Sequence, residues 1–143
     1  MKHDVLIVDD HQMIRESISS LLRKYSDFRV IGQAAEGAQA IQEVAELKPD
    51  VVILDINLPQ VSGPEAAREM LSLQPTLKIL AVSIYSDRPL IDSMIQSGAA
   101  GFILKDFLFE ELIAGMNAVT NGRRFYCSKL DNAAPNEYLK KVQ

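Results

Sequence analysis

The stretch Val51-Val52-Ile53-Leu54-Asp55 is an aliphatic run that ends in one carboxylate. Two other runs end in charged residues in the same way: Val5 to Val8 is followed by Asp9-Asp10, and Gly101 to Leu104 is followed by Lys105. Such runs are typical of strands buried on both faces of a parallel sheet. The carboxyl ends of parallel strands face one crevice, in which ligands bind. We therefore expect three carboxylates and one amine to meet at one edge of a sheet.

Strand-like and helix-like patterns alternate along the chain. Two more strand-like runs cover residues 28–31 and 79–83, and apolar residues at helical spacing follow each strand. Lys48-Pro49, Gly98 and Asn121-Gly122 mark the ends of helices. The order is a βα unit repeated five times. It predicts an α/β fold, a doubly wound, flavodoxin-like (βα)5 parallel sheet with strand order 2-1-3-4-5 and helices on both faces.

Domain boundaries follow from where this alternation stops. The chain has 143 residues, which suits one domain with a core that needs no disulfide or structural metal. We predict that residues 1–127 form this domain. From Ser128 the pattern breaks down, and residues 128–143 are predicted to be a linker or tail.

Composition excludes several classes of protein. Cys127 is the one cysteine, so a disulfide framework and a cysteine-built zinc site are excluded, and a cytoplasmic location is expected. No apolar stretch approaches the ~20 residues that span a membrane, so no membrane contact is expected. The formal net charge is −4, so the chain has no excess of basic residues that would attract a nucleic-acid backbone. By itself it is therefore not expected to bind DNA.

The predicted cluster of Asp9, Asp10 and Asp55 has a physical consequence, since three carboxylates in one crevice repel one another. Mg²⁺ would relieve the repulsion, because it binds through one or two carboxylates, waters and a substrate phosphate. Taken singly, Asp9-Asp10 can also be interpreted as helix caps, Lys105 as a solvated lysine and Ser83 as a local cap. Their presence together at matching strand ends favours a phosphate-transfer site instead.

The segment from Asp55 to Gly63 is the most specific motif, with a strand-end carboxylate followed by a loop that contains Pro59. Together with Asp9-Asp10, Ser83 and Lys105, it resembles the receiver domain of two-component response regulators. The resemblance covers about Met1 to Cys127. Finer details are similar to the subfamily that carries a C-terminal LuxR-type helix-turn-helix output domain: Asp9-Asp10-His11 with Arg15-Glu16 close behind, Gly98-Ala99-Ala100-Gly101-Phe102, and Lys105-Asp106.

The resemblance implies a role for each of these residues. Asp55 would accept a phosphoryl group from a sensor histidine kinase, and the Lys105 amine and Ser83 hydroxyl would contact that group. Mg²⁺ would be held by Asp10, Asp55 and the backbone carbonyl of Asn57, with Asp9 acting through water. Ser83 and Phe102 would be the switch residues, although Phe102 can also be interpreted as plain core packing.

The resemblance also implies a phosphorylation-dependent signalling switch rather than an enzyme with an external substrate. The domain would catalyse only its own phosphorylation and dephosphorylation. Phosphorylation would change the face formed by the fourth helix, fifth strand and fifth helix, and Phe107-Leu108-Phe109 would supply apolar surface for a homodimer. The output would be transcription through a DNA-binding domain that this chain lacks. A natural stand-alone receiver that acts by protein contact is the alternative.

Ile84 departs from the family pattern, whereas His11 matches it. Ile84 follows Ser83 where many receivers have a small residue, so its branched side chain is predicted to narrow the approach to Asp55, and Tyr85 is predicted to cover the same opening. His11 suggests a base or a phosphohistidine. We interpret it instead as a residue near the start of the first helix, without a role in phosphoryl transfer.

Two other classes with this sheet topology have different requirements. A Mg²⁺-dependent phosphohydrolase with an aspartyl-phosphate intermediate would have a second acid two residues after the nucleophile, where this chain has Asn57. A nucleotide- or flavin-binding module would have a glycine-rich loop after the first strand, where this chain has Asp9-Asp10-His11-Gln12. The sequence favours the receiver over both.

Overall fold

The fold is an open α/β sheet wrapped by helices. The computed structural model describes residues 2–85 and 87–126. In these residues the elements follow one another in the order β1 (His3–Val8), α1 (Gln12–Leu22), β2 (Phe28–Ala34), α2 (Gly37–Leu47), β3 (Val51–Asp55), α3 (Gly63–Leu73), β4 (Lys78–Ser83), α4 (Arg88–Gln96), β5 (Gly101–Leu104), a 3₁₀ turn η1 (Lys105–Phe107), α5 (Leu108–Thr120) and β6 (Phe125–Tyr126).

All strand pairs are parallel, and the sheet order is β2-β1-β3-β4-β5-β6. The predicted order 2-1-3-4-5 is confirmed. The sixth strand was not predicted, because two residues are too short to show a strand periodicity. It forms because the turn after α5 brings the chain back to the open edge of β5, where the Phe125 N–H donates to the Ala100 carbonyl at 3.1 Å.

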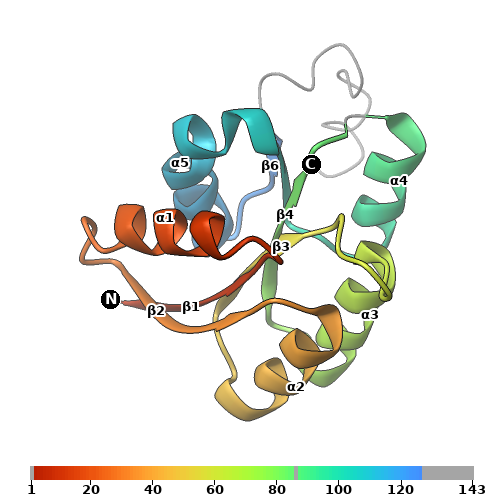
Figure 1. Cartoon of the computed structure of the whole chain (residues 1–143), viewed down its shortest axis with the longest axis horizontal. Coiled ribbons are helices and arrows are strands. Elements are labelled where there is room, and N and C mark those ends of the chain that lie inside the picture. Colours follow the sequence, from red (N-terminus) through yellow and green to blue (C-terminus); the bar gives the residue numbers. More distant parts are fainter. Residues whose placement is uncertain (1, 86, 127–143) are drawn as a thin grey trace.

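The helices lie in two layers. Figure 1 shows α1 and α5 on one face of the sheet and α2, α3 and α4 on the other. β3 lies in the middle, and all five of its residues are buried. This burial explains why the strand is uniformly aliphatic, as expected for a parallel sheet covered on both faces. Asp55 is its last residue and shares that burial.

The predicted helix ends are confirmed. Lys48 follows α2 with a left-handed φ of 50°, and Pro49 cannot continue the helix. Gly98 follows α4 and Gly122 follows α5 with φ values of 98° and 77°, which glycine adopts without strain. Ser62 caps the start of α3, and its hydroxyl accepts the Glu65 N–H at 3.2 Å.

Strand register brings the charged ends together. Val8 pairs with Leu54, so Asp9 continues beyond β1 beside Asp55 at the end of β3. Asp55 pairs with Val82, and Ser83 pairs with Leu104. The single crevice that the sequence predicts is therefore present.

Lys105 directly follows β5, as predicted. β5 ends at Leu104, and Lys105 begins the 3₁₀ turn that leads into α5. The predicted tail 128–143 and Cys127 lie outside the described residues. Within residues 2–85 and 87–126, no helix has both the length and the apolar character needed to cross a membrane.

Candidate functional site

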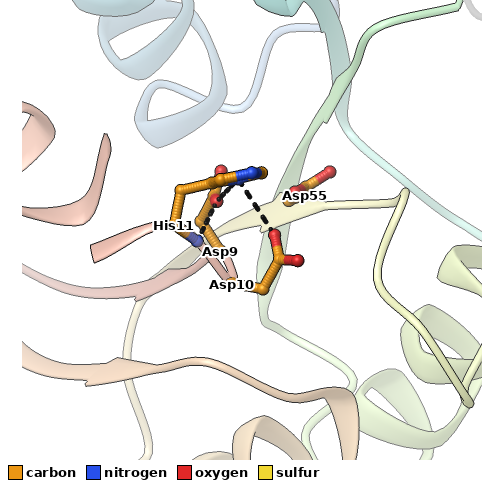
Figure 2. Close-up of side chains that lie close together, drawn as sticks. All are labelled: Asp9, Asp10, His11 and Asp55. Carbon is orange, nitrogen blue, oxygen red and sulfur yellow. Dashed lines mark hydrogen bonds and ion pairs between the residues drawn. The ribbon is translucent and has the colours of Figure 1, made fainter. Parts of the chain in front are cut away.

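Four side chains from two strand ends form a compact cluster at the carboxyl edge of the sheet. Asp9, Asp10, His11 and Asp55 each place one potential ligand atom within 4.8 Å of the others (Figure 2). Asp9 and Asp55 are each 2% exposed, whereas Asp10 and His11 face solvent. The cluster thus has a buried floor of two carboxylates and an open rim.

Lys105, which follows β5, extends its side chain to the two buried carboxylates of this cluster. Its Nζ lies 3.0 Å from Asp9 Oδ2 and 3.2 Å from Asp55 Oδ2. Burial alone lowers the pKa of the Lys105 ammonium, but the contacts with the two carboxylates outweigh burial and raise it above its ordinary value. Lys105 therefore stays charged and partly neutralises both carboxylates.

Asp55 is held by its own loop as well as by Lys105. Its Oδ1 accepts the Asn57 N–H at 2.9 Å, which fixes the plane of the carboxylate. Burial raises the pKa of Asp55 above its ordinary value, and the charge of Asp9 adds to the rise. The Asn57 N–H and Lys105 oppose this rise without cancelling it. A carboxylate with a raised pKa in a crevice is typical of functional sites.

The end of β4 completes the crevice. Ser83 is fully buried, and its hydroxyl accepts the Tyr85 N–H at 2.9 Å. The Ile84 N–H donates to the Asn57 side-chain oxygen at 3.0 Å, so the β4 end is tied to the Asp55 loop. The Ile84 and Tyr85 side chains are 54% and 55% exposed, so neither belongs to the core.

The N-terminal part of α1 contributes contacts to which sequence reasoning assigned no role. His11 precedes α1, and its Nδ1 lies 3.0 Å from Asp9 Oδ1 and 3.0 Å from Asp10 Oδ1. Arg15 donates from Nη1 to the Asp9 backbone carbonyl at 2.7 Å and from Nε to Gln33 Oε1 at 3.2 Å. Arg15 is four residues after His11, one helical turn away, and this spacing was the available indication.

The structure also locates the predicted switch and dimer residues. Phe102 is 1% exposed and belongs to the core, an arrangement that suits both interpretations of this residue. Of Phe107-Leu108-Phe109, which were predicted to supply apolar surface, Phe107 is half-buried and Leu108 contributes none. Leu108 is 1% exposed, because the first turn of α5 directs it into the core, and only Phe109, at 47%, is well exposed.

The donor set suits a hard divalent cation. The Asp9, Asp10 and Asp55 oxygens lie close enough to share one ion, and oxygen ligands are those that Mg²⁺ prefers. Lys105 supplies one positive charge beside the three carboxylates, so negative charge remains in excess. A divalent cation would offset that excess.

Residues 5–117 match the family model of the response regulator receiver domain. The chain belongs to the response regulator receiver family. Its relatives include the transcriptional regulatory protein DegU of Brevibacillus brevis, 32% identical over 99% of this chain and 60% of DegU. The oxygen regulatory protein NreC of Staphylococcus epidermidis is 35% identical over 97% of this chain and 64% of NreC.

Solved structures agree with this membership. A two-component response regulator of the LuxR family from Aurantimonas sp. SI85-9A1 is 25% identical with a TM-score of 0.89, over 97% of this chain and 99% of that one. The signal receiver domain of a NarL regulator from Mycobacterium tuberculosis is 30% identical with a TM-score of 0.80, over 85% and 98% of the two chains. The receiver spans only 60% of DegU and 64% of NreC.

The raised pKa of Asp55 predicts how the receiver's stability depends on pH. Below the pKa of free aspartate, about 3.9, Asp55 is protonated in the folded and unfolded states and has no effect. As pH rises, the unfolded state loses the proton first, so the Asp55 carboxyl destabilises the metal-free fold progressively. We expect Asp55→Asn to raise the free energy of unfolding at pH 7 by on the order of 1 kcal/mol.

Urea unfolding with a chelator, at several pH values, measures this effect. The gain should vanish toward pH 3, and the exposed Asp27→Asn should show no comparable trend. A gain for Asp55→Asn that is independent of pH would contradict a charge-based cause.

Proposed function

We propose that this receiver is a phosphorylation-dependent switch in which Asp55 accepts a phosphoryl group from a sensor histidine kinase. The observation that supports the proposal is the convergence of Asp9, Asp10 and Lys105 on the buried Asp55 carboxylate. In the transfer, an Asp55 oxygen forms a bond to phosphorus as the bond between phosphorus and the kinase histidine breaks. The product is an acyl phosphate on Asp55.

The receiver's own residues position and neutralise the group that is transferred. The Asn57 N–H orients the Asp55 carboxylate through Oδ1. The Lys105 ammonium already contacts Asp55 Oδ2 and can move onto a phosphoryl oxygen as a point charge. The Ser83 hydroxyl accepts the Tyr85 N–H, and its own proton would be donated to the phosphoryl group. Phosphoryl transfer depends on such positioning and charge neutralisation.

We assign the metal ligands as Asp10, Asp55 and the backbone carbonyl of Asn57, with Asp9 acting through water. Asp10 suits direct binding because it lies at the open rim, whereas Asp9 is buried and engaged by Lys105. When bound, Mg²⁺ would neutralise negative charge on the phosphoryl oxygens.

We propose that the switch controls transcription through an output domain outside this sequence. The relatives DegU and LnrK are named transcriptional regulatory proteins, and the chain spans 60% and 63% of their lengths. The cytoplasmic location stays a prediction, as does the alternative of a stand-alone receiver. The phosphohydrolase is not favoured, because Asn57 stands where that mechanism needs an acid and its side-chain oxygen is bonded to the Ile84 N–H.

The first test concerns the acceptor. Incubation of the receiver with acetyl phosphate and Mg²⁺ should add one phosphoryl group in intact-mass spectrometry, on Asp55, whose buried carboxylate lies at the end of β3 in contact with Lys105. Asp55→Asn should show no adduct. Asp27→Asn, an exposed acid away from the site, serves as the control. An adduct that persists in Asp55→Asn would refute the assignment.

Metal binding should depend more on Asp10 than on Asp9. Asp10→Ala removes a direct ligand and should weaken Mg²⁺ binding by at least tenfold, about 1.4 kcal/mol. Asp9→Ala removes only a water-mediated contact and should weaken it several-fold less. Calorimetric titration of each variant with Mg²⁺ makes the comparison, and equal losses would contradict the distinction between direct and water-mediated roles.

Access to Asp55 should be limited by the side chains that follow Ser83. The Ile84 N–H is bonded to the Asn57 side chain and its own side chain is exposed, so we infer that this side chain lies at the mouth of the crevice with Tyr85 next to it. In-line attack requires an open path to phosphorus, so Ile84→Ala should speed labelling by acetyl phosphate and spontaneous dephosphorylation.

The two rates are measured in parallel with Leu73→Ala, which truncates an equally exposed leucine on α3. The expected increase for Ile84→Ala is several-fold and that for Leu73→Ala is negligible. If both rates for Ile84→Ala stay within twofold of the parent, about 0.4 kcal/mol, Ile84 does not obstruct the site.

Phosphorylation should also favour a homodimer through the face of α4, β5 and α5. Inward movement of Ser83 toward the phosphoryl group would change the space available to Phe102 and so bias that face between two states. Sedimentation with beryllium fluoride, an acyl-phosphate mimic, should show a mass increase that Phe109→Asp reduces and Leu73→Asp does not. An unchanged mass on addition of the mimic would favour monomeric signalling.

A further inference from the structure

We propose that His11 makes the metal site of this receiver a mixed oxygen and nitrogen site that prefers transition-metal cations such as Co²⁺ and Mn²⁺. The inference rests on the proposed function, because it concerns the same cation site beside Asp55. It goes beyond that function by adding a ligand and a metal preference.

The distances around His11 match those between neighbouring ligands of one ion. Its Nδ1 lies 3.0 Å from Asp9 Oδ1 and 3.0 Å from Asp10 Oδ1 (Figure 2). Two ligands at right angles, each bound at ~2.1 Å, are separated by ~3.0 Å. A cation bound by Asp10 would therefore have the His11 ring nitrogen at the spacing of a neighbouring ligand, with Asp9 still acting through water.

His11 and Lys105 use different oxygens of the shared carboxylate. His11 contacts Asp9 Oδ1, whereas Lys105 contacts Asp9 Oδ2 and Asp55 Oδ2. The imidazole is at the exposed rim of the cluster, since the His11 side chain is 63% exposed, whereas the Lys105 side chain is 13% exposed. An ion on the rim side would not displace Lys105 from its position beside Asp55.

The backbone fixes the ring in this place. His11 precedes α1 in an extended conformation, with φ of −97° and ψ of 110°, and its N–H donates to Asp9 Oδ1 at 2.8 Å. The same carboxylate oxygen therefore receives the backbone N–H and faces the ring nitrogen. This turn orients Nδ1 toward the carboxylates, although the side chain is 63% exposed.

Ligand chemistry converts this geometry into a metal preference. Mg²⁺ prefers oxygen ligands, whereas imidazole suits first-row transition metals, whose affinities rise from Mn²⁺ through Co²⁺ to Ni²⁺. A rival role for His11 is that of a cation that pairs with Asp9 and Asp10 and competes with any metal. The two roles predict opposite effects of removing the imidazole, because a ligand strengthens binding and a competing cation weakens it.

The test compares His11→Asn with the parent receiver, both as untagged chains in a Cys127→Ser background that removes the single thiol. His3→Asn is the matched control. His3 is the other histidine of the chain, and it lies at the opposite end of β1 with its ring 6.3 Å from that of Phe28. The measurements are calorimetric titrations with Co²⁺ and with Mg²⁺, and pulsed EPR of bound Mn²⁺.

We expect the ratio of Co²⁺ to Mg²⁺ affinity to fall at least fivefold in His11→Asn and to stay unchanged in His3→Asn. Bound Mn²⁺ should show coupling to an imidazole ¹⁴N in the parent and in His3→Asn but not in His11→Asn. An unchanged or increased ratio in His11→Asn, or the absence of nitrogen coupling in the parent, would overturn the inference. Failure of the parent to bind Mg²⁺ at all would instead contradict the proposed function.

Discussion

The sharing of one ammonium group by two buried carboxylates is the interaction on which the site depends. Lys105 contacts Asp9 and Asp55 at the edge of a sheet whose interior is apolar. Burial of either carboxylate without a cation nearby would be costly. The pair of contacts therefore lets the fold keep the Asp55 carboxylate buried and close to positive charge.

This arrangement leaves the crevice sensitive to added charge. Asp55 retains a raised pKa despite Lys105, since burial and Asp9 act in the opposite direction. A cation or a phosphoryl group would alter the electrostatic balance among these groups, because Lys105 supplies only one positive charge for the two carboxylates. The hydrogen bond from the Ile84 N–H to the Asn57 side chain links the end of β4, next to Ser83, to the Asp55 loop. A change at Asp55 thus has a direct physical route to β4 and its neighbours.

Much of the fold follows from local patterns in the sequence. The aliphatic runs before Asp9, Asp55 and Lys105 predict buried parallel strands, and the alternation with amphipathic segments predicts the doubly wound topology. The helix ends at Lys48 and Gly98 follow from backbone preferences that single residues express. Parallel strands align their carboxyl ends, so the meeting of the acids with Lys105 was also predictable.

Other features depend on contacts between segments that no local pattern encodes. The sequence by itself determined the strands, their order and the residue types at the crevice. These features follow from the hydrophobic periodicity of the chain and from the topology of parallel sheets. Only the tertiary structure decided that Lys105 bridges two carboxylates, that His11 faces Asp9 and Asp10, and that Leu108 is buried while Phe109 is exposed. Such details depend on side-chain rotamers and on the packing of elements distant in the chain, which are set only when the core closes.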